Sequence, residues 1–597
     1  MSEYIAPVRD MQFVLQELAG LVQVAQLPGY EEATPDLVNA VLEEAAKFAE
    51  GVLSPLNVMG DREGAQWQDQ RVTMPKGFKE AYRLFAESGW TALSAEVQWG
   101  GQGLPKLVDA AVSEMWKSAN HAFSLCPLLT SGAIEALLLA GSASIKKIYL
   151  EKMVSGEWTG TMNLTEASAG SDLAAVRCRA EPQADGSYKI FGQKIFITYG
   201  EHDMADNIVH LVLARTPTAP EGVKGISLFV VPKFIVGDDG RLGERNDAYC
   251  VSIEHKLGIH ASPTALMAFG DHGGAVGHLV GEENRGLETM FVMMNAARFG
   301  IGLEGVAVCE RAYQRARNFA RERIQCADIG LRGGPKVPII AHPDVRRMLM
   351  SMKAQAEASR ALAYVVAAAH DTAIHHTDAV TRQQNQAFVD LMIPVVKGWS
   401  TEIGVEVAST GIQVHGGMGF IEETGAAQYL RDSRISTIYE GTTGIQANDL
   451  IGRKIAREDG ATLKVLIAAM RALDADLAGQ GGEHFTAIRR RFNVAIDALA
   501  QAGEWIVMAY TADVRAASAG AVPFLRLMGV VAGGWQMVRA ALIAQAKMDA
   551  GDSDPFYSAK IITTRFYADH LLSQAEGLAS SVTDGAEGVM ALPEDLF

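Results

Sequence analysis

Residues 286–323 read GLETMFVMMNAARFGIGLEGVAVCERAYQRARNFARER, and this stretch separates two possible fold classes. The segment GIGLEG formally matches the glycine fingerprint of dinucleotide-binding βαβ folds. That fingerprint needs a strand before its glycines, whereas the residues on both sides continue a single helical pattern of apolar side chains. We therefore predict one long helix over about 287–323, in which Gly300, Gly302 and Gly305 allow close packing against another helix.

The flanking sequence extends this helical pattern in both directions. Apolar faces at helical spacing predict further long helices over 343–376 and 384–411 and another set from about 443, which suits a helical bundle. An N-terminal helical layer is expected to include residues 34–56, with Thr34 as cap and Pro35 in the first turn. Between these parts, short runs rich in Val, Ile, Phe and Tyr, separated by Gly, Pro, Asp and Asn, predict a small antiparallel β domain.

The predicted fold is α+β and mainly α, in four parts. These are an N-terminal helical domain (1–156), a central antiparallel β domain (157–282), a C-terminal four-helix-type bundle (283–455) and an additional helical domain (456–597). The last part is rich in Ala, and breaks are expected at 479–482, Pro523 and Pro555.

Composition and charge restrict the function. The 597 residues are 48% hydrophobic and 21% charged, as in ordinary globular proteins, and the length implies several domains. A formal net charge of −17 argues against a nucleic-acid coat or a binder of anionic membranes. An anionic ligand must therefore meet a local basic or amide-rich pocket.

Cysteine and histidine placement predicts neither disulfides nor metal. The 5 cysteines include no C-x-x-C pair, and the histidines show no H-E-x-x-H spacing, so no metal site is assigned. The N-terminus carries charges within its apolar residues, unlike a secretory signal. The apolar stretch 527–538 is too short to span a bilayer, so we expect a reduced, cytoplasmic protein without stable membrane insertion.

Two patches carry candidate chemistry. Residues 162–172, MNLTEASAGSD, place hydroxyls among small residues at the start of the β domain, which suits a phosphate or a polar heterocycle. Residues 411–420, GIQVHGGMGF, and 438–446, IYEGTTGIQ, offer glycines for the close approach of a phosphate group. Glu440 lies in a polar turn next to glycine in the second patch.

The sequence resembles the acyl-CoA dehydrogenase family, in particular its branch of about 600 residues with an extra C-terminal helical domain. Six motifs carry the resemblance in the family's order: TEASAGSD (165–172), KIFIT (194–198), KLGIHASPT (256–264), ARER (320–323), QVHGGMGF (413–420) and IYEGT (438–442). The resemblance implies an FAD-dependent enzyme that oxidises the Cα–Cβ bond of an acyl-CoA. It implies that Glu440 is the catalytic base, and Ala297 leaves no carboxylate at the other position where some relatives carry the base.

The resemblance also implies which residues bind the ligands. The expected FAD contacts are Thr165, Ser171, Phe196, Thr198, Arg323, Gln413, Gly416, Gly417, Thr442 and Gln446. The expected substrate contacts are Ser171, Ser262 and Arg431. In this family the FAD site is completed by a second subunit, so a homodimer is expected.

Several alternatives stay open at this point. The substrate is either a medium- to long-chain fatty acyl-CoA, as in fatty acid β-oxidation, or 3-(methylthio)propanoyl-CoA. The expected electron acceptor is an electron-transferring flavoprotein, with an acyl-CoA oxidase that uses oxygen as the alternative. A non-catalytic DNA-binding relative is disfavoured because residues 456–597 hold 12 Lys and Arg against 17 Asp and Glu. The same residues are expected to brace the dimer or to cap the substrate entrance.

Overall fold

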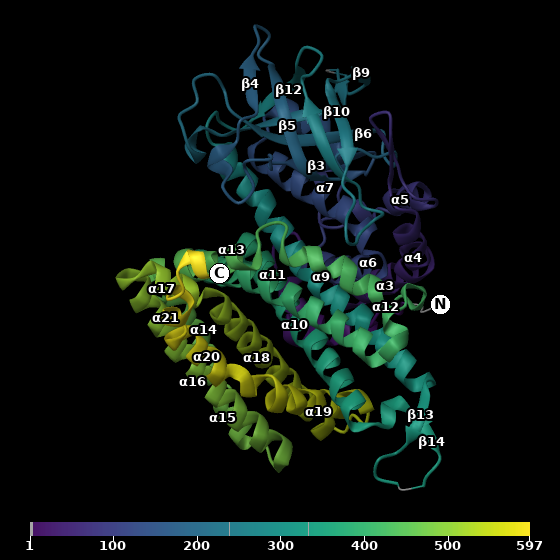
Figure 1. Ribbon diagram of the computed structural model, residues 1–597, viewed down its shortest axis with the longest axis vertical. Coiled ribbons are helices and arrows are strands. Elements are labelled where there is room, and N and C mark those ends of the chain that lie inside the picture. Colours follow the sequence, from purple (N-terminus) through teal and green to yellow (C-terminus); the bar gives the residue numbers. More distant parts are fainter. Residues whose placement is uncertain (1–3, 238, 332) are drawn as a thin grey trace. The chain divides into compact units, whose positions relative to one another are not determined.

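The computed structural model describes residues 4–237, 239–331 and 333–597 (Figure 1). Its chain forms two compact units, which we call the sheet unit and the helical unit. The sheet unit comprises residues 47–104 and 119–297, and the helical unit comprises residues 1–46, 105–118 and 298–597. Helix α9 (Gly286–Glu322) supplies residues to both. The four-part division expected from the sequence stays a prediction.

The sheet unit is built on eight strands in the order β10-β11-β5-β12-β7-β6-β3, with β4 paired to β5. Their bounds are β3 Trp158–Asn163, β4 Arg179–Pro182, β5 Tyr188–Thr198, β6 Asn207–Ala214, β7 Ser227–Pro232, β10 Ala248–Ile253, β11 Thr264–Phe269 and β12 Ala275–Val280. The expected strands are confirmed, and all neighbours but one are antiparallel. The exception corrects the prediction: β3 pairs in parallel with β6, because the chain between them makes a crossover through β4 and β5.

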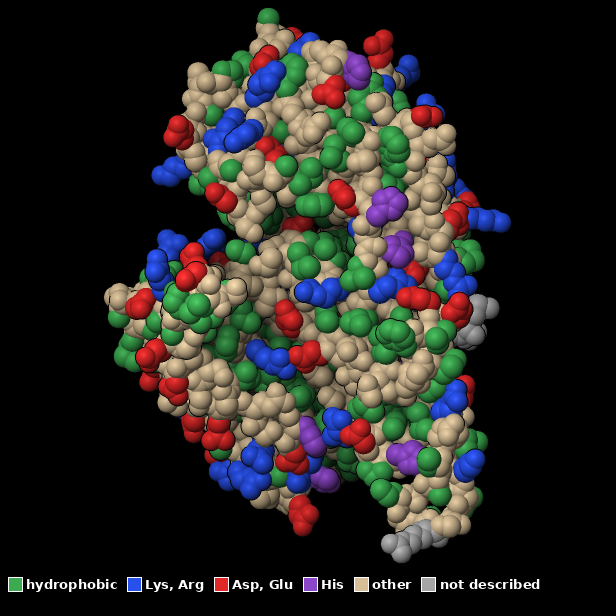
Figure 2. All heavy atoms as spheres, in the orientation of Figure 1, with side chains coloured by type: hydrophobic (Ala, Val, Ile, Leu, Met, Phe, Trp, Pro, Cys, Tyr) green, Lys and Arg blue, Asp and Glu red, His purple; other side chains and the backbone are tan. Residues whose placement is uncertain are grey.

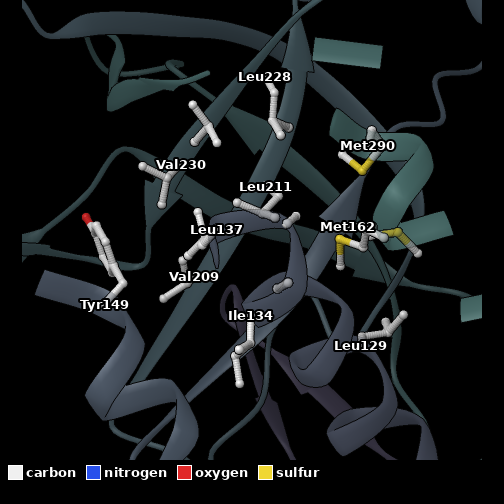
Figure 3. Close-up of a cluster of buried hydrophobic side chains, with 14 of the residues drawn as sticks. Leu129, Ile134, Leu137, Tyr149, Met162, Val209, Leu211, Leu228, Val230 and Met290 are labelled. Carbon is white, nitrogen blue, oxygen red and sulfur yellow. The ribbon is translucent and has the colours of Figure 1, made fainter. Parts of the chain in front are cut away.

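The core of the sheet unit lies between the sheet and the helices α7 (His121–Ala140) and α8 (Ala143–Val154). Strands β3, β6 and β7 are buried along their whole length, which explains the largely apolar sequences of β6 and β7. Figure 3 shows side chains from both layers meeting there, among them Leu137 of α7, Val209 and Leu211 of β6, and Val230 of β7. Asn120 and Ser142 cap the two helices by accepting backbone N–H groups.

The remaining elements of the sheet unit are short. They are α4 Ser54–Glu63, α5 Phe78–Glu87, the hairpin of β1 Gln66–Gln68 and β2 Arg71–Thr73, and the hairpin of β8 Phe234–Val236 and β9 Leu242–Arg245. The helix expected over 34–56 is confirmed: α3 (Pro35–Phe48), capped by Thr34 as predicted, continues through a π-helical turn at 49–53 into α4.

Three long helices dominate the helical unit: the main part of α9, α10 (Pro343–His375) and α11 (Ala379–His415). The continuous helix predicted over the glycine fingerprint is confirmed, and so is its close packing. A Cβ on Gly302 would lie 2.6 Å from Val396 of α11, and one on Gly305 would lie 2.2 Å from the Ser400 carbonyl oxygen. Helix α11 begins five residues earlier than predicted, because the Asp378 side chain caps it by accepting from the Thr381 N–H.

The other helices of this unit come from both ends of the chain. They are α1 Val8–Phe13, α2 Leu21–Val24, α6 Lys106–Ala119, α12 Ala426–Ser433, α13 Thr443–Asn448, α14 Ala461–Arg471, α15 Asp474–Gly479, α16 Gly482–Ala512, α17 Val514–Ala519, α18 Ala521–Asp549, α19 Pro555–His570, α20 Ala575–Asp584 and α21 Ala586–Met590. A small hairpin, β13 Ile324–Ala327 and β14 Lys336–Pro338, follows α9.

The helices α18 and α19 pack against α10, as Figure 1 shows. The break expected at Pro523 lies just before it: α17 ends at Ala519, and Pro523 lies in the first turn of α18, where an N–H has no acceptor within the helix. A Cβ on Gly529 of α18 would lie 2.1 Å from the Trp399 ring, so α18 approaches α11 closely. The added helices therefore share a core with α10 and α11.

Among the residues that the structure describes, three helices are long and apolar enough to cross a membrane by length and composition alone: His121–Ala140, Gly286–Glu322 and Ala521–Asp549. In each, between 67% and 78% of the most apolar window is buried inside the protein. Their apolar character is thus used largely for internal packing.

Candidate functional site

Glu440 lies in a turn between two short helical segments of the helical unit. Its backbone has φ 54°, which lies in the left-handed region. This conformation is unfavourable for any residue that carries a side chain. Gly441 follows with φ 94°, which glycine adopts without that cost. Thr442 then caps α13, its hydroxyl accepting the Ile445 N–H at 3.2 Å. We call residues 439–442 the catalytic turn, after the predicted role of Glu440.

Buried side chains from neighbouring segments hold the catalytic turn. The Lys397 ammonium of α11 donates to the Gly441 carbonyl oxygen at 2.6 Å, and the Tyr439 hydroxyl donates to Glu304 of α9. The Gln446 amide nitrogen donates to the carbonyl oxygens of Glu440 at 3.3 Å and Gly441 at 3.4 Å. Gln446 is fully buried, and these two hydrogen bonds tie it to the backbone of the turn.

The surroundings of Glu440 shift its proton affinity. Burial raises the pKa of the Glu440 carboxyl above its ordinary value, and the nearby positive charges of Arg298 and Lys397 only partly offset this. Burial also lowers the pKa of Lys397 to about 8 and lowers the pKa of Arg298. A half-buried carboxyl with a raised pKa is the group that general base catalysis near neutral pH requires.

Sequence reasoning missed two residues of this site, Lys397 and Glu304. Each is a single charged residue in an otherwise apolar stretch of a buried helix, IPVVKGW and GIGLEGV. Lys and Glu are almost never fully buried without a specific partner. A lone charged residue in the apolar pattern of a buried helix could therefore have identified both Lys397 and Glu304 as candidate site residues.

Three of the predicted FAD contacts come together in the sheet unit, where the chain leaves β3. The Ile195 N–H donates to the Thr165 carbonyl oxygen at 2.9 Å, and the Thr161 hydroxyl donates to the Thr198 carbonyl oxygen at 2.7 Å. These bonds place Thr165 beside the end of β5, which carries Phe196 and Thr198. Phe196 has φ 59° and a 60% exposed side chain, so its ring faces outward at a strained position.

A buried ion pair fixes the loop that begins at Thr165. The Lys194 ammonium lies 2.8 Å from the Glu166 carboxylate, which also accepts the N–H groups of Arg177 and Cys178 at 2.7 and 3.0 Å. Ser171, predicted to contact both FAD and substrate, is exposed on the same loop. The loop is thus held at its base, while its hydroxyl at residue 171 is open to solvent.

Four further predicted FAD contacts lie near the end of α11 in the helical unit. Phe319 of α9 stacks on His415 with ring centroids 4.4 Å apart, and the Arg323 guanidinium lies 5.1 Å from the Phe319 ring centre. This stacking brings Arg323 near the stretch that contains Gln413, Gly416 and Gly417. Gln413 and both glycines are exposed, and a Cβ on either glycine would meet nothing within 4 Å.

The two remaining predicted substrate contacts, Ser262 and Arg431, stay predictions. The side chain of Ser262 is fully buried. Arg431 of α12 is engaged by Glu422, with nitrogen-to-oxygen distances of 3.1 and 2.8 Å. The sequence could not show either feature, because burial and ion pairing depend on the tertiary fold. No group of His, Cys, Asp and Glu suited to a metal ion occurs among the residues that the structure describes.

The residues present suit FAD. The bare backbone at Gly416 and Gly417 leaves room for a phosphate or an adenosine, and an exposed aromatic ring at Phe196 suits packing against a flavin. The buried His415 donates through Nδ1 to the Gly411 carbonyl oxygen, whereas its Nε2 has no hydrogen-bond partner within the described chain.

Comparison with known proteins identifies the family of this chain. Family models match in order: the acyl-CoA dehydrogenase N-terminal domain at residues 37–157, the middle domain at 161–271, the C-terminal domain at 284–455 and an acetyl-CoA dehydrogenase C-terminal-like domain at 463–593. The 3-methylmercaptopropionyl-CoA dehydrogenase of Ruegeria pomeroyi is 49% identical over 98% of this chain and 99% of its own. The broad-specificity linear acyl-CoA dehydrogenase FadE5 of Mycobacterium tuberculosis is 35% identical over 100% of both chains.

Solved structures share the fold. Caenorhabditis elegans ACDH-11 in complex with C11-CoA superposes with a TM-score of 0.76 at 19% identity, covering 98% of this chain and 95% of that one. A Bacillus anthracis acyl-CoA dehydrogenase complexed with FAD gives 0.74 at 20% identity, covering 96% and 92%. With four family models in order and a relative nearly half identical over its whole length, this chain belongs to the FAD-dependent acyl-CoA dehydrogenase family, in the branch with an additional C-terminal helical domain.

Proposed function

We propose that this enzyme introduces a trans-2,3 double bond into an acyl-CoA, with Glu440 as the base that removes the α-proton. The observation that carries this proposal is the setting of Glu440: a carboxyl of raised pKa in a strained turn held by buried side chains. An α-proton of a thioester is only weakly acidic, so a carboxylate of raised proton affinity removes it more readily than an ordinary surface carboxylate.

FAD, when bound, supplies the acceptor for the β-hydride. The contacts proposed for it are Thr165, Ser171, Phe196 and Thr198, together with Thr442 next to the proposed base. Arg323, Gln413, Gly416 and Gly417 are proposed to reach the FAD of a neighbouring subunit. Gln446 supports the backbone of the catalytic turn from inside. The proton taken from the substrate rests on a Glu440 carboxylate oxygen, and the expected stabiliser of the developing enolate is a backbone amide of the catalytic turn.

For the substrate, we propose 3-(methylthio)propanoyl-CoA in preference to longer acyl chains. The support is the 49% identical relative, whose name states that substrate, whereas the 35% identical relative is named for broad-specificity linear acyl-CoAs. The test is a series of acyl-CoAs from four to sixteen carbons together with 3-(methylthio)propanoyl-CoA, followed by anaerobic bleaching of the flavin absorbance. Bleaching only with chains of eight carbons or more would contradict the proposed substrate.

We propose an electron-transferring flavoprotein as the electron acceptor, and a cytoplasmic homodimer as the working form. Stoichiometric hydrogen peroxide during turnover in air would instead assign an acyl-CoA oxidase. Light scattering of the holoenzyme tests the dimer.

Binding of nucleic acid is not proposed. Helix α16 carries three consecutive arginines at 489–491. The guanidinium of Arg489 is already paired with the Asp474 carboxylate through two contacts of 2.7 and 2.8 Å. On the face that Figure 2 displays, acidic and basic side chains are interspersed. Such a surface lacks the basic stripe that binds phosphate backbones. A shift of duplex DNA that weakens with salt would contradict this view.

A further inference from the structure

The catalytic turn is fastened on both sides of Glu440 by ionisable side chains. The residue before the glutamate, Tyr439, donates its hydroxyl proton to Glu304. The carbonyl of the residue after it, Gly441, accepts from Lys397 at 2.6 Å. Glu304 and Lys397 are both completely buried, and they come from two different helices, α9 and α11.

Such an arrangement is costly, and packing alone does not account for it. A charged group loses its hydration when buried, and apolar side chains of similar volume often replace buried ion pairs without loss of stability. The left-handed backbone of Glu440 adds a cost of about 1–3 kcal/mol, which persists only where the surroundings fix the conformation. The two side chains meet this requirement, because they anchor the turn at its two flanking residues.

We propose that Lys397 and Glu304 are positioning residues that hold Glu440 toward the substrate and act on its carboxylate with charges of opposite sign. This inference rests on the proposed role of Glu440 as the base.

The charges around Glu440 predict how the pH dependence of the reaction should change when Lys397 or Glu304 is replaced. The positive charges of Lys397 and Arg298 lower the pKa of Glu440, and the negative charge of Glu304 raises it. Lys397 is itself faced by Glu440, Glu304, Arg298 and Glu402. Removing the charge of Lys397 should therefore raise the pKa of Glu440, whereas neutralising Glu304 should lower it.

The test uses two variants of the FAD-loaded enzyme, Lys397→Met and Glu304→Gln. The first readout is kcat/KM against pH, whose acid limb reports the ionisation of Glu440 in the free enzyme. We expect the acid limb to move to higher pH in Lys397→Met and to lower pH in Glu304→Gln. A general loss of stability would not move the two limbs in opposite directions.

The second readout isolates the proton transfer. An acyl-CoA analogue with sulfur in place of the β-carbon has no β-hydride to give, but its α-proton can still exchange with D2O. We expect this exchange, followed by NMR, to slow at least about tenfold in Lys397→Met because the base is misplaced. The matched control is Lys560→Met, which removes another buried lysine, one paired with Asp10 and Glu357, and should leave the acid limb in place.

The outcomes separate the two proposals. If the wild-type enzyme and Glu440→Gln exchange the α-proton equally fast, the proposed function fails. If Glu440→Gln is inactive but both variants keep the wild-type acid limb and exchange rate, the positioning role fails. Glu304→Gln preserves the shape of its side chain, so it decides the question even if Lys397→Met does not fold.

Discussion

At Glu440 two physical requirements compete. The carboxylate must be ionised to accept a proton, yet it must also lie in a partly buried turn where ionisation is disfavoured. The positive charges of Arg298 and Lys397 allow a partly buried carboxyl to ionise, because they limit how far burial raises its pKa. The proton affinity of the base is thus a balance between burial and two cations.

Glu440→Gln tests the role of the carboxylate directly. The substitution keeps the size and shape of the side chain but removes its ability to take a proton, so kcat should fall by about a thousandfold. FAD content, measured from the absorbance spectrum, should match that of the wild type. Wild-type turnover in this variant would show that another group is the base.

The pH dependence of the wild-type enzyme should follow the same carboxyl. Since burial raises the pKa of Glu440, kcat/KM should rise with pH through an apparent pKa above that of an ordinary glutamate. Below that pH the carboxyl is protonated and cannot act as a base. A profile that is flat down to pH 4 would contradict this expectation.

The identity of the candidate base could be predicted from the sequence, but its supports could not. Glu440 stands in a motif next to glycine, whereas Lys397 is 43 residues and Glu304 is 136 residues away in the chain. The placement of these two follows only from the packing of α9 and α11. Ser262 shows the same limit: its motif suggests a ligand contact, but the burial of its side chain follows only from the tertiary packing.

At the scale of the elements, the contact between α9 and α11 determines how close Glu304 and Lys397 come to the catalytic turn. Small residues make this contact possible, because Gly302 and Gly305 let the α11 backbone approach within a distance that a side chain would prevent. The glycine fingerprint in the sequence therefore serves helix packing.

Gly305→Ala should destabilise the enzyme by about 1–3 kcal/mol, because the new methyl group would clash with the backbone at Ser400. Urea unfolding of the holoenzyme measures this difference. The matched control is Gly479→Ala at the end of α15, where a Cβ meets nothing within 4 Å and stability should not fall. Equal stability of the two variants would contradict the packing argument.

The existence of the long helices could be predicted from the sequence, but the residue at which each begins or ends could be predicted only to within a few positions. Residues 379–383, AVTRQ, lack an apolar period, so α11 was predicted to begin at 384, although Asp378 caps it earlier. The parallel pairing of β3 with β6 was also missed, because strand direction depends on the crossover and not on the residues of either strand.

For the helical unit as a whole, a buried ionic network joins its distant parts. The Arg360 guanidinium of α10 contacts Asp10, Glu114 and Glu310 at 2.7, 2.6 and 2.8 Å. Lys560 of α19 binds Asp10 and also Glu357, the latter at 2.8 Å. The additional C-terminal helices are therefore fastened to the N-terminal segment and to α10, which the sequence could not indicate.

Lys560→Met should destabilise the helical unit by about 3–5 kcal/mol, since it leaves Asp10 and Glu357 with fewer buried partners. Thermal unfolding and limited proteolysis after residue 456 measure the loss. Arg471→Met, which breaks an exposed pair with Asp497, is the control and should change little. Equal effects would show that the network contributes no more than a surface pair.

The same network predicts sensitivity to acid. Burial alone would raise the pKa of Asp10, but Lys560 and Arg360 outweigh burial and hold the pKa below its usual range. The stabilisation is therefore complete above the ordinary carboxyl pKa of about 4 and is lost as the pH falls below it. The midpoint of thermal unfolding should drop more steeply below pH 4 in the wild type than in Asp10→Asn.

The contact between Asp10 and Lys560 also has a consequence for biosynthesis, since 550 residues separate its partners. During translation, Asp10 and Arg360 leave the ribosome long before α19, so the nascent chain carries their charges without the lysine that completes the cluster. The ionic cluster can therefore be completed only after α19 has been synthesised, and until then the surface of α10 that α19 covers lacks that partner. A premature stop before α19 would thus leave Asp10 and Glu357 without Lys560, and α10 without a helix that packs against it.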